Sequence, residues 1–213
     1  MRVLDLFCGG GGAARGYADA GFEVVGVDIE PQSRYPYEFH RADWREFLSN
    51  VTPGDYDLIH ASPPCQGYSK STTYGAHVPR LILPVRLALR PLGPYVIENV
   101  WDARYTLQNW TLLCGTMFSL PITRHRLFES SFTIDPPPHL PCDGVQTRYA
   151  RARGWEPHDM VIAGHGSTKG AKEKWKEIMQ IDWDVRIEDL SEMVPPAYTR
   201  HIGLMYVLSH TGE

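Results

Sequence analysis

The sequence predicts an α/β fold built on a parallel sheet. Short apolar runs of strand length alternate with segments of helical pattern over residues 1–132, the arrangement of α/β proteins. Four glycines, Gly9 to Gly12, follow the first apolar run, a placement common in such folds. The chain has 213 residues, 43% of them hydrophobic, which is enough for one domain with a buried core.

The expected elements can be placed in chain order. Apolar runs predict strands over residues 2–7, 22–28, 56–61, 94–100 and 126–132. Helices are predicted from the glycine run to Gly21 and over residues 43–50, 80–90, 105–114 and 195–210. Pro84 could kink the helix over 80–90, whereas proline at the start of 195–210 suits a first helical turn. From 133 to 180 the alternation breaks, since a proline-rich stretch is followed by a glycine-rich turn and a short polar helix.

Charge is distributed unevenly along the chain. The net charge is −4, which excludes a uniform polycation, but residues 145–180 hold seven basic and four acidic side chains. This segment could contact a polyanion, or it could be an ordinary solvated face of a lysine-rich helix. No apolar run approaches the ~18 residues of a membrane span, and the first residues lack the pattern of a secretion signal. We therefore expect a cytoplasmic protein with no membrane partner.

The four cysteines are Cys8, Cys65, Cys114 and Cys142. They form no CxxC pair, and no His/Cys group has the linear spacing of a zinc site, so we expect reduced thiols and no metal. Cys65 differs from the others because it follows two prolines just past a predicted strand end, where open α/β sheets bind ligands. It could be a nucleophile, or a buried structural cysteine like the other three.

The glycine run and two later acids indicate a nucleotide-like ligand. Glycines allow a ligand to approach the backbone, and a helix N-terminus follows. Asp28 ends the second predicted strand, where a carboxylate can accept hydrogen bonds from both ribose hydroxyls. Asp43 and Trp44 could bind the amino group and the face of an adenine. The alternative is a flexible glycine turn, with Asp28 and Asp43 serving as helix caps.

Two further motifs suit chemistry at Cys65. Glu98 and Asn99 close a very apolar predicted strand, where burial would raise the pKa of the carboxyl enough for it to donate a proton. Arg124 and Arg126 are two residues apart at a predicted strand start, so both side chains should point the same way. They could hold a carbonyl oxygen and support a thiolate, or they could be surface charges of an exposed strand.

Taken in order, these motifs resemble those of the DNA (cytosine-5) methyltransferase family. The matching stretches are DLFCGGGG, GVDIE, ADW, PPCQGYS, ENV, RHR and PPAYTRHIG, over residues 3–132 and 181–204. The resemblance implies a Rossmann-like, S-adenosylmethionine-dependent methyltransferase fold with a mostly parallel seven-stranded sheet and helices on both faces. It also implies methyl transfer from S-adenosylmethionine to C5 of cytosine in DNA, with S-adenosylhomocysteine as product.

The resemblance assigns catalytic roles position by position. Cys65 would attack C6 of cytosine, and Glu98 would hold N4 and protonate N3, while Asn99 would help position Glu98 and the thiol loop. Arg126 would contact the O2 side of the base, with Arg124 supporting it. In a duplex the cytosine would be flipped out to reach Cys65, and the loop from Gln66 to His77 would close over it, with Gln66 and Ser69 at the DNA. The cofactor would be lined by Phe7, Gly9, Gly11, Asp28, Ile29, Asp43, Trp44 and Pro64.

The sequence departs from the family pattern at three places. Ile122 and Leu204 stand where the family usually has glutamine and asparagine. The third departure is the short segment 133–180, between catalytic parts 1–132 and 181–213, where the family commonly has a large target-recognition domain. We expect weak or very short sequence recognition, or a partner that supplies it. The DNA contacts would come from Arg148, Arg151, Arg153 and the lysines from Lys169 to Lys176, among them Lys172.

Two other functions remain open at this level. The short recognition segment would also suit cytosine-5 methylation of RNA or of a nucleotide. A catalytically inactive module that binds the cofactor or DNA is a third possibility, although Cys65, Glu98, Arg124 and Arg126 are all retained. A glycine-loop oxidoreductase is disfavoured, because the glycine spacing is not that of a dinucleotide site.

Overall fold

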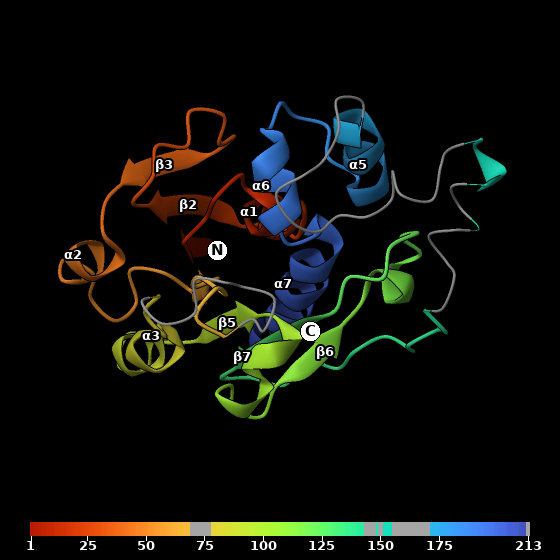
Figure 1. Cartoon of the computed structure of the whole chain (residues 1–213). Helices are drawn as coiled ribbons and strands as arrows, with labels where there is room; N and C mark the ends of the chain where they lie inside the picture. The colour runs from red at the N-terminus through yellow and green to blue at the C-terminus, as the bar shows by residue number, and fades with distance from the viewer. Residues whose placement is uncertain (69–77, 143–147, 149–150, 155–170, 212–213) are drawn as a thin grey trace.

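The computed structural model describes residues 1–68, 78–142, 148, 151–154 and 171–211 (Figure 1). One sheet forms its centre, with strands in the order β3-β2-β1-β4-β5-β7-β6. The strands are β1 (Arg2–Leu6), β2 (Glu23–Asp28), β3 (Glu38–Arg41), β4 (Leu58–Ala61), β5 (Tyr95–Asn99), β6 (Thr111–Leu113) and β7 (Arg126–Ser130).

The sheet is mostly parallel, as the sequence predicts. β1 pairs in parallel with β2 and β4, β3 adds to β2, and β5 adds to β4. β7 runs antiparallel to both β5 and β6. Consequently the carboxyl ends of β1, β2, β4 and β5 and the amino end of β7 lie along one edge of the sheet, where ligands bind in open α/β folds.

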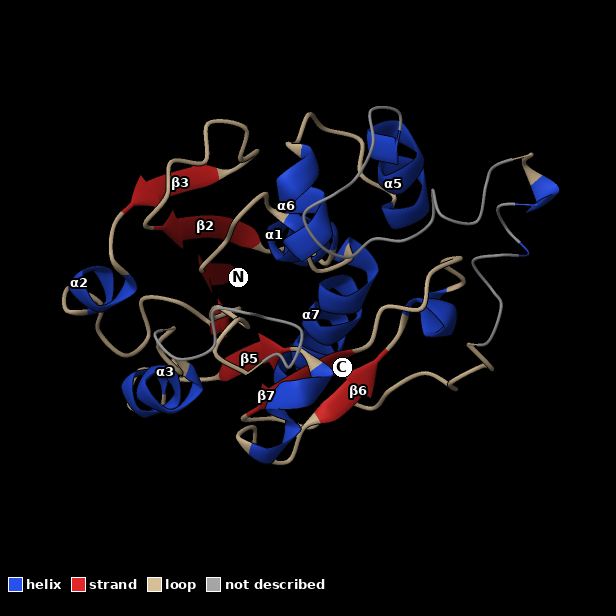
Figure 2. Ribbon diagram, in the orientation of Figure 1, coloured by secondary structure: helices blue, strands red, loops and turns tan. Residues whose placement is uncertain are grey.

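Helices cover both faces of the sheet (Figure 2). The helices α1 (Gly12–Asp19) and α7 (Pro196–Thr211) share a buried cluster with Val3 and Phe128. The helices α2 (Trp44–Leu48) and α3 (Ile82–Leu89) share the other cluster with Leu4 and Leu127. Adjacent strand residues fall into different clusters because side chains alternate across a strand.

The close packing of α1 on α7 depends on a glycine. A Cβ at Gly16 would lie 2.1 Å from both the Pro196 carbonyl oxygen and Thr199 Oγ1. The Thr199 hydroxyl donates a hydrogen bond to the Ala13 carbonyl oxygen at 2.9 Å. The last helix of the chain is therefore fixed against the first, which bears on the site because α1 begins at the glycine loop.

Several predicted elements change in the structure. The helix predicted over 105–114 is wrong: 3₁₀ turns, η1 (Trp101–Tyr105) and η2 (Gly115–Phe118), flank the short strand β6. β3 and α6 (Ile187–Glu192) were not predicted, since β3 is a mostly exposed strand and α6 is very short. Pro84 causes no kink, because it lies in the first turn of α3, where its missing N–H is not needed.

The polar helix predicted within 133–180 is α5 (Ala171–Met179), and it contributes to the core. Trp175, Ile178 and Met179 are buried in the same cluster as α1 and α7. Its lysines lie on the remaining surface, so the sequence reads as polar although one side is apolar. α5 lies near α6 in Figure 1. No helix among the described residues has the length and hydropathy to cross a membrane.

Candidate active site

The predicted catalytic residues converge on one edge of the sheet. Cys65 follows the end of β4, Glu98 and Asn99 are the last two residues of β5, and Arg126 is the first residue of β7. Antiparallel pairing places Asn99 opposite Leu127, so Arg126 begins its strand where β5 ends. The topology thus brings together residues from three separate segments of the sequence.

The loop that carries Cys65 is held by contacts to neighbouring elements. The Asn99 side chain donates to the Pro63 carbonyl oxygen at 2.9 Å, and the Tyr68 N–H donates to the Cys65 carbonyl oxygen at 2.9 Å. Arg80 Nε donates to the Gly67 carbonyl oxygen at 3.0 Å. Asn99 thereby contacts the thiol loop, which it is predicted to position.

Glu98 forms a buried ion pair with Arg126. Arg126 Nε lies 3.0 Å from Glu98 Oε1, and the two side chains are 15% and 8% exposed. Burial raises the pKa of Glu98, while Arg126, a hydrogen bond from Ser62, and Arg124 lower it. The upward direction dominates, so this carboxyl retains its proton to higher pH than an ordinary glutamate does.

The Cys65 thiol is partly buried beside this pair. Burial raises the pKa of Cys65, Glu98 raises it further, and Arg126 lowers it. The thiolate is therefore not the resting form, and it is favoured when the charge of Glu98 is neutralised by a proton. Proton uptake at Glu98 and thiolate formation at Cys65 support each other.

Arg124 has a different surrounding from Arg126. It precedes β7, so the two-residue repeat of a strand does not extend to it. Burial lowers the pKa of Arg124 to about 9, Arg126 lowers it further, and Glu98 and Cys65 raise it, so Arg124 lies close to the other predicted catalytic residues. Its guanidinium donates to the carbonyl oxygens of Met193 at 3.1 Å and Ser191 at 2.7 Å. The Tyr198 hydroxyl donates to the Arg124 carbonyl oxygen at 2.6 Å. Arg124 thus joins the start of β7 to the segment between α6 and α7, which is a supporting position.

The glycine loop and Asp28 form a second part of the same edge. Asp28 accepts hydrogen bonds from the backbone N–H groups of Gly9 at 3.0 Å and Glu30 at 2.9 Å. Gly9 and Gly11 have positive φ angles of 48° and 89°, and a Cβ on Gly9 would meet no atom within 4 Å. Gly9 therefore borders open space, and Asp28 holds the loop in shape.

Not all glycines of the run serve an approaching ligand. A Cβ at Gly10 would lie 2.7 Å from Met193 Cε, and one at Gly12 would lie 2.1 Å from Met193 Cγ. The indole N–H of Trp183 also donates to the Gly10 carbonyl oxygen at 3.1 Å. Gly10 and Gly12 are thus required for packing against the C-terminal part of the chain, a reason that the sequence does not reveal.

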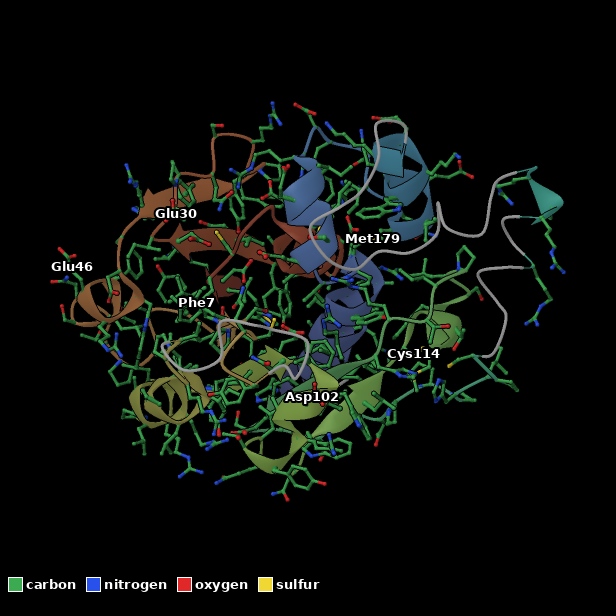
Figure 3. All side chains as sticks on the ribbon, in the orientation of Figure 1. Phe7, Glu30, Glu46, Asp102, Cys114 and Met179 are labelled. Atoms are coloured by element: carbon green, nitrogen blue, oxygen red, sulfur yellow. The ribbon has the colours of Figure 1, made fainter. Side chains whose placement is uncertain are left out.

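The predicted adenine contacts lie around the start of α2. Asp43 caps this helix by accepting from the Arg45 N–H at 2.8 Å, which is the alternative role weighed for it. Trp44 is 6% exposed, with the Arg45 guanidinium 4.4 Å from its ring centre, so it has little surface left for a ligand. Phe7, which Figure 3 labels, has its ring centre 6.0 Å from that of Trp44. Ile29 is 61% exposed and Pro64 is half-buried beside Cys65.

Comparison with known proteins decides the family. The family model "C-5 cytosine-specific DNA methylase" matches residues 1–83. The type II methyltransferase M.HgiGI of Herpetosiphon aurantiacus is 30% identical over 119 residues, which cover 49% of this chain and 94% of that protein. The chain belongs to the C-5 cytosine-specific DNA methylase family.

Other relatives are longer than this chain. M.AgeI of Thalassovita gelatinovora is 35% identical over 91 residues, which cover 35% of this chain and 20% of that protein. The chain spans 38% of M.HgiDI. Among solved structures, Entamoeba histolytica EhMeth gives a TM-score of 0.59 at 14% identity, covering 100% of this chain and 99% of that one. S. pombe Dnmt2 gives 0.56 at 14%, covering 98% and 99%. These two structures confirm the methyltransferase fold.

A buried hydrogen-bonded chain behind Glu98 was not predicted. Tyr17 Oη lies 3.0 Å from His60 Nδ1, and His60 Nε2 lies 3.0 Å from Ser62 Oγ. Burial lowers the pKa of His60 to about 3, so the ring is neutral; it can accept from Tyr17 and donate to Ser62, which donates to Glu98. The sequence does show a histidine inside an apolar strand, which indicates a buried polar contact. It does not show the partners, because Tyr17 and Ser62 lie outside that strand.

Asp5 is a second buried polar residue that was not predicted as part of the site. It is fully buried on β1, and burial raises its pKa to about 8, while the Tyr35 hydroxyl, 3.4 Å away, lowers it. Oδ1 forms no hydrogen bond of ordinary geometry within the described part of the chain, although the Ala14 backbone N–H also lowers the pKa slightly. A carboxylate inside the apolar run RVLDLF was the sequence signal.

The predicted DNA contacts are only partly described. Ser69 and Lys169 lie outside the described residues. Arg148, Arg151 and Arg153 are exposed, and Arg153 pairs with Glu177 at 3.0 Å. Lys172 pairs with Asp184 at 2.8 Å. Gln66 lies in the thiol loop, and its buried Oε1 has no hydrogen-bond partner within the described part of the chain. Two of these cations therefore have acidic partners that DNA would have to displace.

Proposed function

We propose that this cytosine methylase transfers a methyl group from S-adenosylmethionine to C5 of cytosine in DNA through a covalent adduct at Cys65. The observation that carries the proposal is the buried Glu98–Arg126 pair beside the Cys65 thiol, at the sheet edge that also holds the glycine loop. An acid, a cation and a nucleophile are thus available together, which is what attack on a cytosine ring requires.

The chain's own residues account for activation of the base. Cys65 loses its thiol proton to water and forms an S–C6 bond as the thiolate, and the electron pair displaced from the ring reaches N3, which takes the proton of Glu98. Glu98 becomes a carboxylate next to Arg126, whose charge stabilises it. The ring is now an enamine, with C5 as its nucleophilic carbon.

The residues around the glycine loop fit the cofactor. Gly9 borders open space and Ile29 is exposed next to Asp28, so a nucleoside could lie along this loop. Asp28 would accept the ribose hydroxyls, and Phe7, Gly11 and Pro64 would line the remainder. Asp43 and Trp44 would shape this side of the cofactor site. Asp43 does so by capping the start of α2, and Trp44 by packing its buried ring near Phe7. When bound, S-adenosylmethionine supplies an electrophilic methyl group on a sulfonium. After C5 is methylated, loss of the C5 proton to water and of the Cys65 sulfur, with return of the N3 proton to Glu98, restores the aromatic ring.

DNA recognition is proposed to involve the basic residues near α5. Arg148, Arg151, Arg153 and Lys172 would contact phosphates, with Ser69 and Lys169 contributing from outside the described residues. Because phosphate contacts release counterions, binding should weaken steeply with salt. The cytosine would be flipped out of the duplex, since Cys65 lies at a strand end within the edge of the sheet. Part of the recognition surface could belong to a partner protein.

Transfer of tritium from labelled cofactor to duplex DNA, RNA and dCMP tests the substrate. Label in duplex DNA is expected, whereas label in RNA or dCMP alone would replace DNA by that substrate. A DNA oligonucleotide with 5-fluorocytosine tests the mechanism, because the fluorine blocks release of the enzyme. A covalent adduct is expected with the natural chain and not with Cys65→Ala, and an adduct that survives this substitution contradicts the assignment of Cys65.

A further inference from the structure

Two cysteines and two histidines come together beside β6 and β7. Their ligand atoms, the sulfurs of Cys114 and Cys142 and ring nitrogens of His125 and His139, all lie within 4.8 Å of one another. Cys142 Sγ is 3.5 Å from Cys114 Sγ, 3.5 Å from His125 Nε2 and 2.8 Å from His139 Nε2. Figure 3 shows Cys114 well apart from Phe7 of the glycine loop, so the cluster is separate from the cofactor side.

Two of these separations match the edges of a tetrahedral zinc site, and the others are close to them. With Zn–S of about 2.3 Å and Zn–N of about 2.0–2.1 Å, tetrahedral ligands lie about 3.3–3.8 Å apart. Two of the three measured separations fall in this range. The third, between His139 and Cys142, is a hydrogen-bond distance, and the exposed His139 ring needs only a small shift to widen it.

The surroundings also favour a metal over a simple group of polar side chains. The two sulfurs are 3.5 Å apart, well beyond the ~2.05 Å of a disulfide. The Thr116 hydroxyl lies 3.5 Å from Cys114 Sγ and 3.3 Å from the Leu140 carbonyl oxygen. The Thr123 hydroxyl donates to the Cys142 carbonyl oxygen at 3.1 Å. Such outer hydrogen bonds hold ligand segments in place around metal sites.

We propose that Cys114, His125, His139 and Cys142 bind one zinc ion in a closed structural site. Two thiolates and two imidazoles form one of the usual structural zinc sets, and thiolate with imidazole disfavours magnesium and calcium. All four positions are filled by protein, so the metal has no open coordination position for substrate. The expectation of no metal is thereby replaced for this part of the chain.

The site would support two functional segments at once. His125 lies between Arg124 and Arg126, so its coordination would restrain the start of β7 near Glu98. Cys142 immediately precedes residues 143–170, which belong to the proposed recognition segment. The stretch from 135 to 142 has no regular secondary structure and exposes Leu140, so it has little core of its own. A metal would supply the stability that packing does not.

Metal analysis of the untagged, purified chain tests the proposal. About one zinc per chain is expected, and replacement by Co(II) should give the visible bands of tetrahedral cobalt with thiolate charge transfer. The wild-type cobalt spectrum does not depend on any variant folding. A folded chain that takes up neither metal, or that contains a Cys114–Cys142 disulfide after purification under reducing conditions, overturns the site.

Matched histidine variants locate the site. His139→Ala removes an exposed ligand and should leave the fold intact, while weakening zinc affinity at least about 10–100-fold, the loss known from changes to outer contacts alone. His40→Ala is the control, because His40 is an exposed histidine that pairs with Glu38 on β3. Chelator competition measures both. Equal zinc affinity in the two variants would contradict the assignment, whether or not the chain methylates DNA.

Discussion

Two buried arginine–glutamate pairs involve glutamates on the neighbouring strands β5 and β7, and they differ in how completely the glutamate is hydrogen-bonded. In the pair formed by Glu129 of β7 and Arg86 of α3, both carboxylate oxygens accept from the guanidinium. Glu129 also accepts from the Tyr95 hydroxyl at 3.2 Å and the Gln108 N–H at 2.7 Å. Glu98 of β5 instead meets Arg126 through one nitrogen, 3.0 Å away, with Ser62 as a further donor.

The difference follows from the face and the edge of the sheet that each glutamate occupies. Ile97 lies opposite Glu129 and Glu98 lies opposite Phe128, so the two glutamates point to opposite faces. Glu129 points to the α3 side, where the helix supplies Arg86. Glu98 points to the α1 and α7 side at the ligand-binding edge, beside Cys65. Glu129, whose two oxygens each accept more than one hydrogen bond, is suited to a structural role. Glu98 accepts fewer hydrogen bonds, so one of its oxygens can carry and release a proton.

The largest expected effect is on activity, at Glu98. Glu98→Gln removes the proton donor and should lower the methyl-transfer rate about 10²–10⁴-fold. The loss of stability should be smaller than in Glu129→Gln, because Arg126 is 15% exposed and keeps some contact with water, whereas Arg86 is 3% exposed. Single-turnover transfer and thermal unfolding measure the two. A rate within threefold of the natural chain would remove Glu98 from the mechanism.

Glu129→Gln should show the reverse pattern. Arg86 would be left buried without its counter-charge, which costs about 3–5 kcal/mol in the free energy of unfolding. The folded fraction should keep its rate of methyl transfer, because Glu129 lies on the other face. Urea unfolding monitored by fluorescence measures the loss. Arg86→Met combined with Glu129→Leu should recover part of it, and a full-sized loss in this double variant would contradict the explanation.

Asp5 extends the comparison to a buried acid whose pKa is raised. Its folded pKa of about 8 exceeds the ordinary value of 3.8, so the folded chain binds an extra proton between these values. Stability should therefore fall as the pH rises through this window, by up to about 1.4 kcal/mol per pH unit. Asp5→Asn should flatten this part of the curve. Unfolding at a series of pH values checks it, and an unchanged slope in Asp5→Asn would contradict the assignment.

The smallest effect is expected at Ser62, the link between His60 and Glu98. Ser62 lowers the pKa of Glu98, so Ser62→Ala should raise it. Glu98 acts as an acid, and its activity is lost as the pH rises through its pKa, so the alkaline limb of the rate profile should move to higher pH. Loss of one hydrogen bond changes energies by about 0.5–1.5 kcal/mol, which limits the shift to about one pH unit. A shift to lower pH would contradict the proposed direction of donation.

The sequence by itself determined the parallel α/β frame, the glycine loop and the thiol, glutamate and arginine positions at strand ends. These features depend on local periodicity and on the rule that strand ends share an edge, so they can be read along the chain. The helix expected over 105–114 failed because pairing with β7 outweighs local preference there. Only the tertiary structure decided the partners: Met193 against Gly12, His60 behind Glu98, Arg124 on the C-terminal segment, and the Cys114, His125, His139 and Cys142 cluster. Each of these contacts joins residues from separate segments whose linear spacing carries no signal, because distance in a folded chain is set by packing.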